Sequence, residues 1–319
     1  MTRVLVTGAF GLVGKSFQKI VLQEDNCDYE YIYISRKDCD LRNLSDVMQC
    51  FGVYKPDVVV HLASCVGGVY ENMNKNYQYL IDNIRINTNI VDACNRHKVS
   101  KLINILSTCI FPDKNVLYPL TSDQLHNGLP HESNIGYAYS KRVLHLTSQL
   151  LTQNKDNVTR VINLTPTNLY GENDNYNLVA SHVIPALVHK TYNAIQNNTC
   201  LRVYGSGNAI RQFLYVDDLS KVILHFIQNE YEQSEISCIV SPPEDHEVSI
   251  KQVVQYISKS FDFTNDIVYD TSYSDGQIKK TTNNNELKKY IDDFEFTKLE
   301  EGINETVLFF KQHYDTIRK

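Results

Sequence analysis

Hydrophobic and polar positions alternate along the first half of the chain in a strand–helix–strand order. Short hydrophobic runs predict buried strands, and longer stretches with a hydrophobic residue every three to four positions predict amphipathic helices. Strands that alternate with helices form a doubly wound parallel sheet in an α/β fold, with ligands bound where the strands end. We expect strands at 3–7, 29–35, 58–62, 101–106 and 159–164, and the longest helices at 76–97 and 137–153.

The pattern loosens after residue 165, where shorter elements predict a second domain. We assign residues 1–165 to a Rossmann domain, to which 212–232 returns, and residues 166–211 and 233–319 to a smaller, mixed α/β substrate domain. We expect a helix that starts at 181–185, a strand at 201–204, a last amphipathic helix at 299–314, and further short elements at 236–240, 249–260 and 267–269.

Composition narrows the class of protein. Hydrophobic residues make up 42% and charged residues 21%, which is ordinary for a soluble globular chain. The formal charge of -6 argues against nucleic acid as a partner, and no hydrophobic run is long enough to span a membrane. A strand begins within three residues of the start, so we expect no signal peptide. Eight cysteines without metal-ligand spacing predict reduced thiols, a cytoplasmic location and no metal site.

The first strand is followed by a glycine-rich turn and a helix. Gly8, Gly11 and Gly14 have the spacing of a dinucleotide-binding fingerprint. Such glycines let the backbone approach a pyrophosphate, and the helix start offers free N–H groups to it. Cofactor contacts are therefore expected from Gly8, Phe10, Gly11, Leu12 and Val13.

The end of the second strand predicts NADP rather than NAD. An acidic residue would hold the ribose 2′-hydroxyl of NAD, but this strand runs into Ser35, Arg36 and Lys37. Two cations after a neutral residue fit a 2′-phosphate, although a solvated loop would look the same. Further cofactor contacts are expected from Asp40 and Leu41 near the adenine and from Leu62, Ala63 and Gly67 after the third strand.

The fourth strand and the helix at 137–153 together predict a ketone-reducing site. Tyr137 and Lys141 lie one helical turn apart, where an ammonium can lower the phenol pKa from its usual value of about 10. Ser107, at the strand end, would give a carbonyl oxygen its second hydrogen bond. Cys109 stands beside this group, although plain hydride transfer does not use a thiol.

With these motifs assembled, the chain resembles the extended short-chain dehydrogenases that act on nucleotide sugars, and among them the GDP-L-fucose synthase family. The most specific matching runs are 106–114, 166–177, 181–187 and 274–280. The resemblance implies an NADPH-dependent enzyme that converts GDP-4-keto-6-deoxy-D-mannose to GDP-L-fucose. It would epimerise C3 and C5 and then reduce C4. It also implies a homodimer that packs through the two long helices.

The resemblance also assigns roles to residues. Cys109 would be the base of the epimerisation and His182 its acid, with Ser107 and Tyr137 stabilising the enolate oxygen. Lys141 would hold the nicotinamide ribose. Further cofactor contacts are expected from Pro166, Asn168, Leu169 and His182, and further substrate contacts from Thr108, Asn168, Lys190, Val203, Tyr204, Arg211, Asp275 and Lys280. Of these, Lys190, Arg211 and Lys280 would face the diphosphate.

Two other functions stay open on the sequence. One is a different nucleotide-sugar epimerase or reductase of the same architecture. The other is a non-catalytic NADP-binding sensor. Intact Ser107, Tyr137 and Lys141 argue against the sensor, because such a protein does not need proton-transfer groups.

Overall fold

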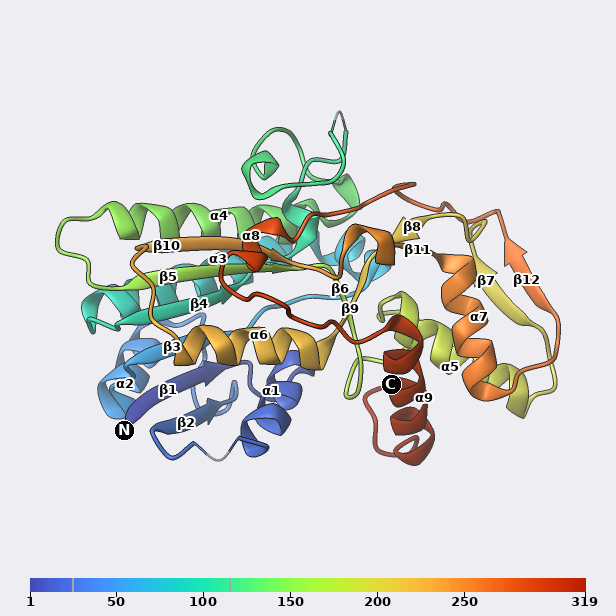
Figure 1. Ribbon diagram of the computed structural model, residues 1–319, viewed down its shortest axis with the longest axis horizontal. Coiled ribbons are helices and arrows are strands. Elements are labelled where there is room, and N and C mark those ends of the chain that lie inside the picture. The colour runs from blue at the N-terminus through green and yellow to red at the C-terminus, as the bar shows by residue number, and fades with distance from the viewer. Residues whose placement is uncertain (25, 115) are drawn as a thin grey trace.

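A six-stranded parallel sheet forms the centre of the molecule (Figure 1). The computed structural model describes residues 1–24, 26–114 and 116–319. The strand order is β10-β5-β4-β3-β1-β2, so the predicted doubly wound parallel sheet is confirmed. The strands are β1 (Thr2–Thr7), β2 (Tyr29–Ile34), β3 (Val58–His61), β4 (Lys101–Ile105), β5 (Arg160–Pro166) and β10 (Glu235–Val240).

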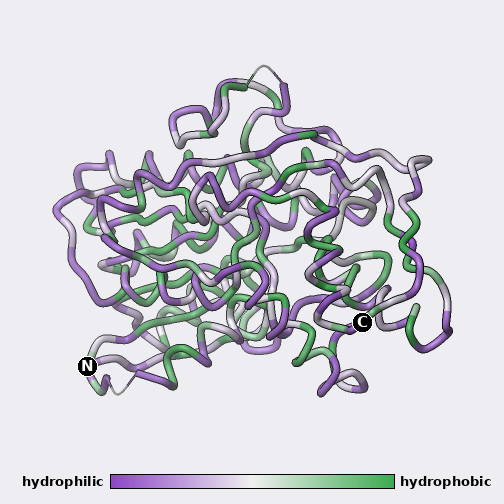
Figure 2. The backbone as a smooth tube through the Cα atoms, turned by 45° about the vertical axis from the view of Figure 1, so that its right-hand side comes forward, coloured by the Kyte–Doolittle hydropathy of each residue, from purple (hydrophilic) through white to green (hydrophobic). Residues whose placement is uncertain are grey.

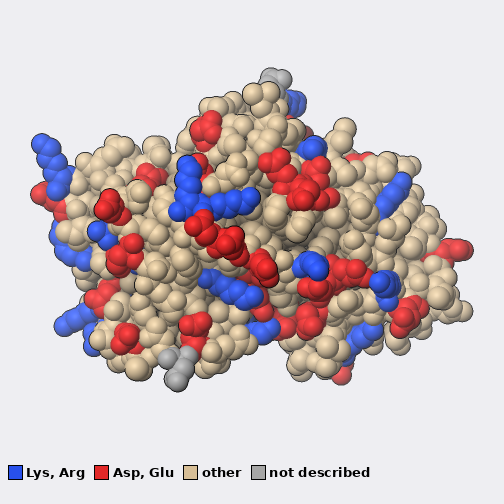
Figure 3. All heavy atoms as spheres, viewed as in Figure 1, with Lys and Arg blue, Asp and Glu red and all other residues tan. Residues whose placement is uncertain are grey.

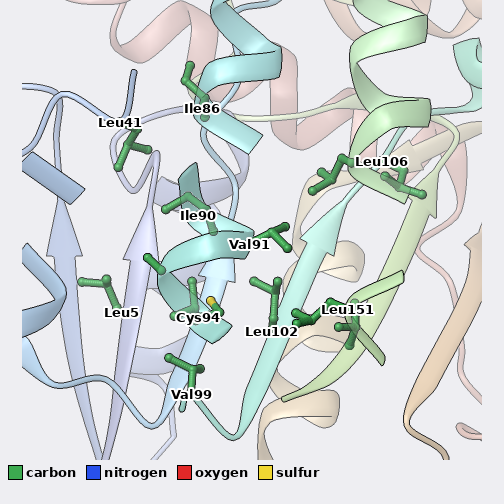
Figure 4. Packing of buried hydrophobic residues seen from close by; sticks show 14 of the residues in the cluster. Leu5, Leu41, Ile86, Ile90, Val91, Cys94, Val99, Leu102, Leu106 and Leu151 are labelled. Carbon is green, nitrogen blue, oxygen red and sulfur yellow. The ribbon is translucent and has the colours of Figure 1, made fainter. Parts of the chain in front are cut away.

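Helices cover both faces of this sheet. Alternate residues of β1 point to opposite faces: Leu5 joins one hydrophobic cluster, whereas Val4 and Val6 join another. On the Leu5 face, residues of α3 pack onto β1 and β4 (Figure 4). That face is covered by α2 (Leu44–Tyr54), α3 (Val69–Arg96) and α4 (Ile135–Gln153), and the opposite face by α1 (Leu12–Leu22) and α6 (Val216–Gln228).

Two predicted boundaries are wrong. Helix α3 begins at Val69 rather than at residue 76, and its backbone departs from helical geometry at Lys75, so the predicted start marks the end of a kink. Polar residues such as Glu71 and Asn72 in the first turns hide the helix from a hydrophobic pattern. Strand β10 lies after residue 233 yet pairs with β5 in the Rossmann sheet, so 233–319 is not wholly a substrate domain.

A second lobe lies beside the sheet, at the right of Figure 1, around a third hydrophobic cluster. We use "second lobe" for the elements that build this cluster. Its small sheets pair β7 with β12 in parallel, β8 with β11 antiparallel and β6 with β9 in parallel. The helices are α5 (Val183–Gln196), α7 (Ile250–Phe261) and α9 (Leu299–Gln312). The strands are β6 (Asn168–Tyr170), β7 (Leu201–Tyr204), β8 (Ile210–Arg211), β9 (Phe213–Tyr215), β11 (Val248–Ser249) and β12 (Ile267–Asp270).

The segment after β4 is irregular and projects from the body at the top of Figure 1. It holds three short 3₁₀ turns, η1 (Thr108–Ile110), η2 (Ser122–Gln124) and η3 (Glu132–Asn134). Backbone hydrogen bonds connect it to residues 277–283, since Leu120 N donates to Thr281 O over 2.8 Å and Asn283 N donates to Leu120 O over 2.9 Å. The segment after β4 and residues 277–283 are therefore paired side by side, although they are far apart in sequence. The remaining elements are α8 (Asn285–Lys288) and η4 (Glu244–His246).

Surface and interior differ as expected for a globular chain. Hydrophobic segments run through the inside of both lobes (Figure 2), and acidic and basic side chains are interspersed on the face that Figure 3 presents. Within the described ranges, no helix has the length and hydrophobicity needed to cross a bilayer.

Candidate active site

The glycine turn after β1 packs closely against the backbone that follows β3 at the carboxyl edge of the sheet. Gly8 has a φ of +65°, and a Cβ atom there would lie 2.7 Å from the backbone nitrogen of Ala63. A side chain at Gly14 would likewise lie 2.3 Å from the carbonyl oxygen of Ala9. Gly11 is the N-cap of α1. The N–H groups of that helix start are therefore uncovered at the point where β1 and β3 diverge.

A buried polar chain holds the ends of β1 and β3 together. Thr7 Oγ1 lies 2.9 Å from His61 Nδ1 and accepts a hydrogen bond from Ala63 N over 3.2 Å. On its other side, His61 Nε2 lies 3.1 Å from Asn87 Oδ1 of α3. Burial lowers the pKa of His61 to about 3, so its ring is neutral. Sequence analysis missed this network, because its members are far apart along the chain.

At the end of β2, two cations remain near the surface. Arg36 and Lys37 are exposed, and the backbone before them is held by Asp38, which accepts from Ser35 N and Oγ, each over 2.7 Å. Arg36 Nε lies 3.9 Å from Asp40 Oδ2. The two residues expected near the adenine have partners within the protein. Arg42 donates hydrogen bonds of 2.9 and 2.6 Å to the Asp40 carboxylate and lowers the pKa of Asp40 to about 2. Leu41 lies in the hydrophobic core.

The structure brings Ser107, Cys109, Tyr137 and Lys141 together. Ser107 precedes η1, and its Oγ accepts a hydrogen bond from Cys109 N over 3.4 Å. Helix α4 places Tyr137 and Lys141 against the same strand end, with the Lys141 ammonium 5.9 Å from the centre of the Tyr137 ring. That ammonium donates to Ile105 O over 2.7 Å, which fixes it to the end of β4.

The electrostatics of Tyr137 differ from the prediction. Burial raises the pKa of its phenol well above the usual value, the neighbouring Cys109 adds to the rise, and a hydrogen bond with Ser64 opposes it. The Lys141 ammonium is bound to the Ile105 carbonyl, and burial lowers the pKa of Lys141 to about 8. The phenol is therefore protonated at neutral pH, as a proton donor requires.

Cys109 lies among cations. Burial raises the pKa of its thiol, while Lys280, a hydrogen bond with Ser107, and Lys141 oppose that rise. The cations that act on the thiol are lysines from two different parts of the chain. Proton affinity at this sulfur is thus set by competition between burial and positive charge.

His182 belongs to the second lobe. It is the N-cap of α5, its imidazole is exposed, and a backbone hydrogen bond of 2.9 Å from Gly68 N to Ala180 O connects its segment to the loop after β3. Within the described ranges, no hydrogen bond or ion pair joins His182 to Cys109. A substrate between the lobes would have to connect them.

Asp174 is a neighbour of His182 that sequence analysis missed. Its side chain is only 4% exposed, and Oδ1 accepts a hydrogen bond from Asn175 N over 2.7 Å. Among the described residues, nothing bonds to Oδ2. Burial raises the pKa of this carboxyl above its usual value, and the nearby charge of His182 opposes part of that rise. The two side chains therefore interact electrostatically.

The remaining predicted contacts fall into different surroundings. Asn168 follows β5 and donates from Nδ2 to Gln212 O over 2.8 Å, with Pro166 and Leu169 beside it. Gln212 is itself buried and accepts a hydrogen bond from Thr282 N over 2.8 Å, so it connects β9 to the segment that carries Lys280. Sequence analysis did not single out Gln212.

In the second lobe, the Lys190 ammonium lies 3.4 Å from the centre of the Tyr204 ring, which stacks on Tyr273 at 4.0 Å. Val203 points away from this surface into the lobe's core. The Asp275 carboxylate accepts hydrogen bonds from Ser206 N and Oγ, each over 2.7 Å, and thereby supports the turn around Gly205. Burial lowers the pKa of the Arg211 guanidinium.

Known proteins are similar to this chain in sequence and in fold. Residues 4–238 match the NAD dependent epimerase/dehydratase family. The chain belongs to this family. Along its whole length it is similar to the GDP-L-fucose synthase of Dictyostelium discoideum, with 40% identity over 99% of this chain and 97% of that protein. The GDP-L-colitose synthase of Yersinia pseudotuberculosis is 30% identical over 97% of each chain.

A solved member of the family has the same fold. The GDP-L-fucose synthetase from Naegleria fowleri bound to NADP superimposes with a TM-score of 0.93 and 41% identity, covering 100% of this chain and 95% of that one. The predicted resemblance to the GDP-L-fucose synthase family is confirmed.

Proposed function

We propose that the protein converts GDP-4-keto-6-deoxy-D-mannose to GDP-L-fucose by epimerising C3 and C5 and then reducing C4 with NADPH. The observation that carries this proposal is a thiol placed beside a complete ketone-reducing group. Ser107, Tyr137 and Lys141 suffice for a reductase, whereas Cys109 adds a base for the carbons next to the ketone. Similarity over the full chain to GDP-L-fucose synthases supports the same substrate.

The residues at the sheet edge fit NADP. Glycine at position 8 lets the turn approach the Ala63 backbone, where a Cβ atom would clash, and the start of α1, which no side chain caps, suits a pyrophosphate. Arg36 and Lys37 would bind the 2′-phosphate, and Lys141 the nicotinamide ribose. When bound, the nicotinamide supplies the hydride for C4.

Epimerisation needs a stabilised enolate and two proton carriers. Protons on carbons that flank a ketone become acidic when hydrogen-bond donors meet the developing oxyanion, and the hydroxyls of Ser107 and Tyr137 are those donors. Cys109 would remove a proton from one face of the sugar, and His182 would deliver a proton to the other. This division agrees with their origin, since Cys109 follows β4 of the sheet and His182 precedes α5 of the second lobe.

In the reduction, the same pair of hydroxyls would bind O4. Tyr137 would donate its proton to this oxygen, which its raised pKa allows because the phenol is protonated when the ketone binds. One oxygen-binding site would therefore serve three steps.

The match to a GDP-L-colitose synthase favours a second candidate, a related GDP-sugar product made by the same site. The test is to incubate purified protein with NADPH and GDP-4-keto-6-deoxymannose and to identify the product by NMR. We expect NADPH oxidation and GDP-L-fucose. A failure to oxidise NADPH with this sugar would reject the proposal, and faster turnover of another 4-keto GDP-sugar would favour the second candidate.

For the assembly, we propose a cytoplasmic homodimer that packs through α3 and α4. Leu146 and Leu150, one turn apart on α4, are 48% and 56% exposed, and Tyr77 on α3 is 76% exposed. A dimer would cover these hydrophobic side chains. Light scattering should show a dimer that Leu146→Glu combined with Leu150→Glu converts to a monomer, whereas Leu22→Glu on α1 should leave it intact. A wild-type monomer would contradict this assembly.

A further inference from the structure

A row of polar side chains crosses the central sheet near its carboxyl edge. In the register of the strands, Thr7 of β1 lies beside His61 of β3, His61 beside Asn104 of β4, and Asn104 beside Asn163 of β5. Each stands two residues after a member of the hydrophobic cluster that α2, α3 and α4 cover, so all four point to that face. All four are buried, and buried polar groups are costly unless they are hydrogen-bonded. Their partners therefore show what the row holds together.

The hydrogen bonds of His61 have only one consistent direction. Asn87 Nδ2 donates to Ser140 O over 3.1 Å, so the amide oxygen of Asn87 faces His61 Nε2 at 3.1 Å. With the amide turned over, two acceptor oxygens would face each other. His61 Nε2 therefore carries the proton and donates to Asn87. Burial, and after it the charge of Lys141, lower the pKa of His61 to about 3, so the ring is neutral and Nδ1 accepts from the Thr7 hydroxyl over 2.9 Å.

One end of this chain of hydrogen bonds lies at the glycine turn. Thr7 directly precedes Gly8, and Thr7 Oγ1 accepts a hydrogen bond from Ala63 N over 3.2 Å. Gly8 packs on the same residue, because a Cβ atom at Gly8 would lie 2.7 Å from Ala63 N. The Thr7 hydroxyl is therefore held by the two backbone segments that would border a dinucleotide.

The other end lies at the helical turn that carries the ketone-reducing group. Asn87 of α3 donates to the carbonyl of Ser140, the residue before Lys141. The Ser140 hydroxyl donates to Tyr137 O over 2.7 Å, and the Lys141 ammonium donates to Ile105 O over 2.7 Å. The hydrogen bond from Asn87 thus holds the turn from Tyr137 to Lys141 against the strand ends of the sheet.

We propose that His61 is a positioning residue that connects the glycine turn to the start of α4. Through Asn87, its ring would set where the Lys141 ammonium meets the nicotinamide ribose. Through Thr7, the same ring would be held in register with the turn that meets the pyrophosphate. The inference rests on the role proposed for Lys141. A row that served only the packing of the sheet would contribute to stability and leave the binding of the nicotinamide end unaffected.

Two replacements of His61 interrupt the chain of hydrogen bonds on opposite sides. His61→Asn keeps an acceptor near the position of Nδ1 for Thr7 but loses the donor to Asn87, whereas His61→Gln places its amide near the position of Nε2 and keeps that donor. Calorimetry measures the affinity for NADPH and for adenosine 2′,5′-bisphosphate, which lacks the nicotinamide ribose. We expect His61→Asn to weaken NADPH binding about tenfold and to change bisphosphate binding by less than about twofold, and His61→Gln to restore most of the NADPH affinity.

The matched control is Asn163→Leu, at the other end of the row. It removes the hydrogen bond that Asn163 Oδ1 accepts from Asn104 Nδ2 over 3.1 Å, outside the chain that reaches Lys141. Its melting temperature should fall, as that of His61→Asn should, but both affinities should stay at the wild-type level. NADPH binding that His61→Asn leaves unchanged, or weakens no more than bisphosphate binding, would overturn the inference.

Nitrogen-15 NMR of the wild-type protein keeps the test decisive even if His61→Asn does not fold. The ring of His61, assigned by the signals missing from His61→Gln, should be neutral with its proton on Nε2 from about pH 5 to pH 9. Its Nε2 resonance should shift when NADPH binds. A proton on Nδ1, or a resonance that NADPH leaves unchanged, would overturn the inference. Neither measurement uses the sugar, so weakened NADPH binding in His61→Asn of a protein that makes no GDP-L-fucose would reject the proposed function alone.

Discussion

The two groups proposed to move protons are built in different ways. Cys109 lies at a strand end of the central sheet, partly buried, with a hydroxyl and lysines arranged around it. His182 lies at the exposed start of a helix in the second lobe, next to the buried carboxylate of Asp174. The proposed base would therefore be assembled in the free protein, whereas the proposed acid would join the site when a substrate spans both lobes.

Topology explains this difference. Parallel strands end at one edge of the sheet, so the residues that follow β1, β3 and β4 meet there without help from a ligand. Among the described residues, the second lobe shares no strand with that sheet, and it meets the sheet through loop contacts such as Gly68 with Ala180. The position of His182 thus depends on how the lobes approach each other.

The largest effect is expected from removing the base. Cys109→Ser should reduce solvent deuterium exchange at C3 and C5 by about 10³-fold, because a serine hydroxyl is a far weaker base than a thiolate. NADPH binding, measured by fluorescence, should not change. The control Cys200→Ser removes an exposed thiol of the second lobe. Exchange that survives in Cys109→Ser would assign the base role to another residue.

Burial of Lys141 at the strand ends of the central sheet should lower the free energy of unfolding near neutral pH. Burial lowers the pKa of Lys141 to about 8, so from about pH 8 to pH 10 the unfolded chain holds more protons there than the folded protein does. The free energy of unfolding should then rise with pH across this window, by up to about 3 kcal/mol relative to Lys141→Met. Urea unfolding at pH 7 and pH 9.5 measures the difference.

The matched comparison is Lys190→Met in the second lobe, where burial is only partial and the pH dependence should be smaller. Equal pH dependence in the two variants would remove the contrast between a buried and a half-buried lysine.

Replacing the proposed acid, His182, should separate deuterium exchange from inversion, whereas replacing the proposed base, Cys109, should abolish both. In His182→Gln, Cys109 still removes and returns protons on its own face, so exchange should continue while inversion slows about 100-fold. NMR of the recovered sugar measures both rates, and His246→Gln, which alters an exposed histidine of η4, is the control. If exchange fell as far as it does in Cys109→Ser, the division into base and acid would be wrong.

The smallest effect is expected from Asp174. Replacing this buried carboxylate in Asp174→Asn removes the negative charge beside His182 and should slow inversion by less than about tenfold, since the imidazole remains in place. Steady-state kcat for epimerisation measures the change, and Cys109 alkylation in the same variant should match the wild type. An altered alkylation rate would show that the two proton carriers are coupled in the free protein.

Local sequence patterns predicted most strands of the sheet and most residues of the site at its strand ends. The glycine turn and the spacing of Tyr137 and Lys141 are readable because each lies within one strand–turn–helix unit or one helical turn. Strand β10 was misassigned because a short hydrophobic run does not reveal the sheet in which it pairs. The raised pKa of Tyr137 was missed because it follows from burial by residues that are far apart in sequence.

Contacts across long sequence separations were beyond a local pattern. The hydrogen bonds of His61 with Thr7 and Asn87 join three elements, and the segment that carries Lys280 lies beside the projecting loop because their backbones are paired. Such positions become readable only once the pairing of segments is known.

The most direct test of the account is NMR of the product formed in a single turnover with NADPH and GDP-4-keto-6-deoxymannose in deuterated water. A thiol base and a ketone-reducing group in one pocket predict GDP-L-fucose that carries deuterium at both C3 and C5. A reduced sugar that keeps the original configuration at C3 and C5, without deuterium there, would contradict it.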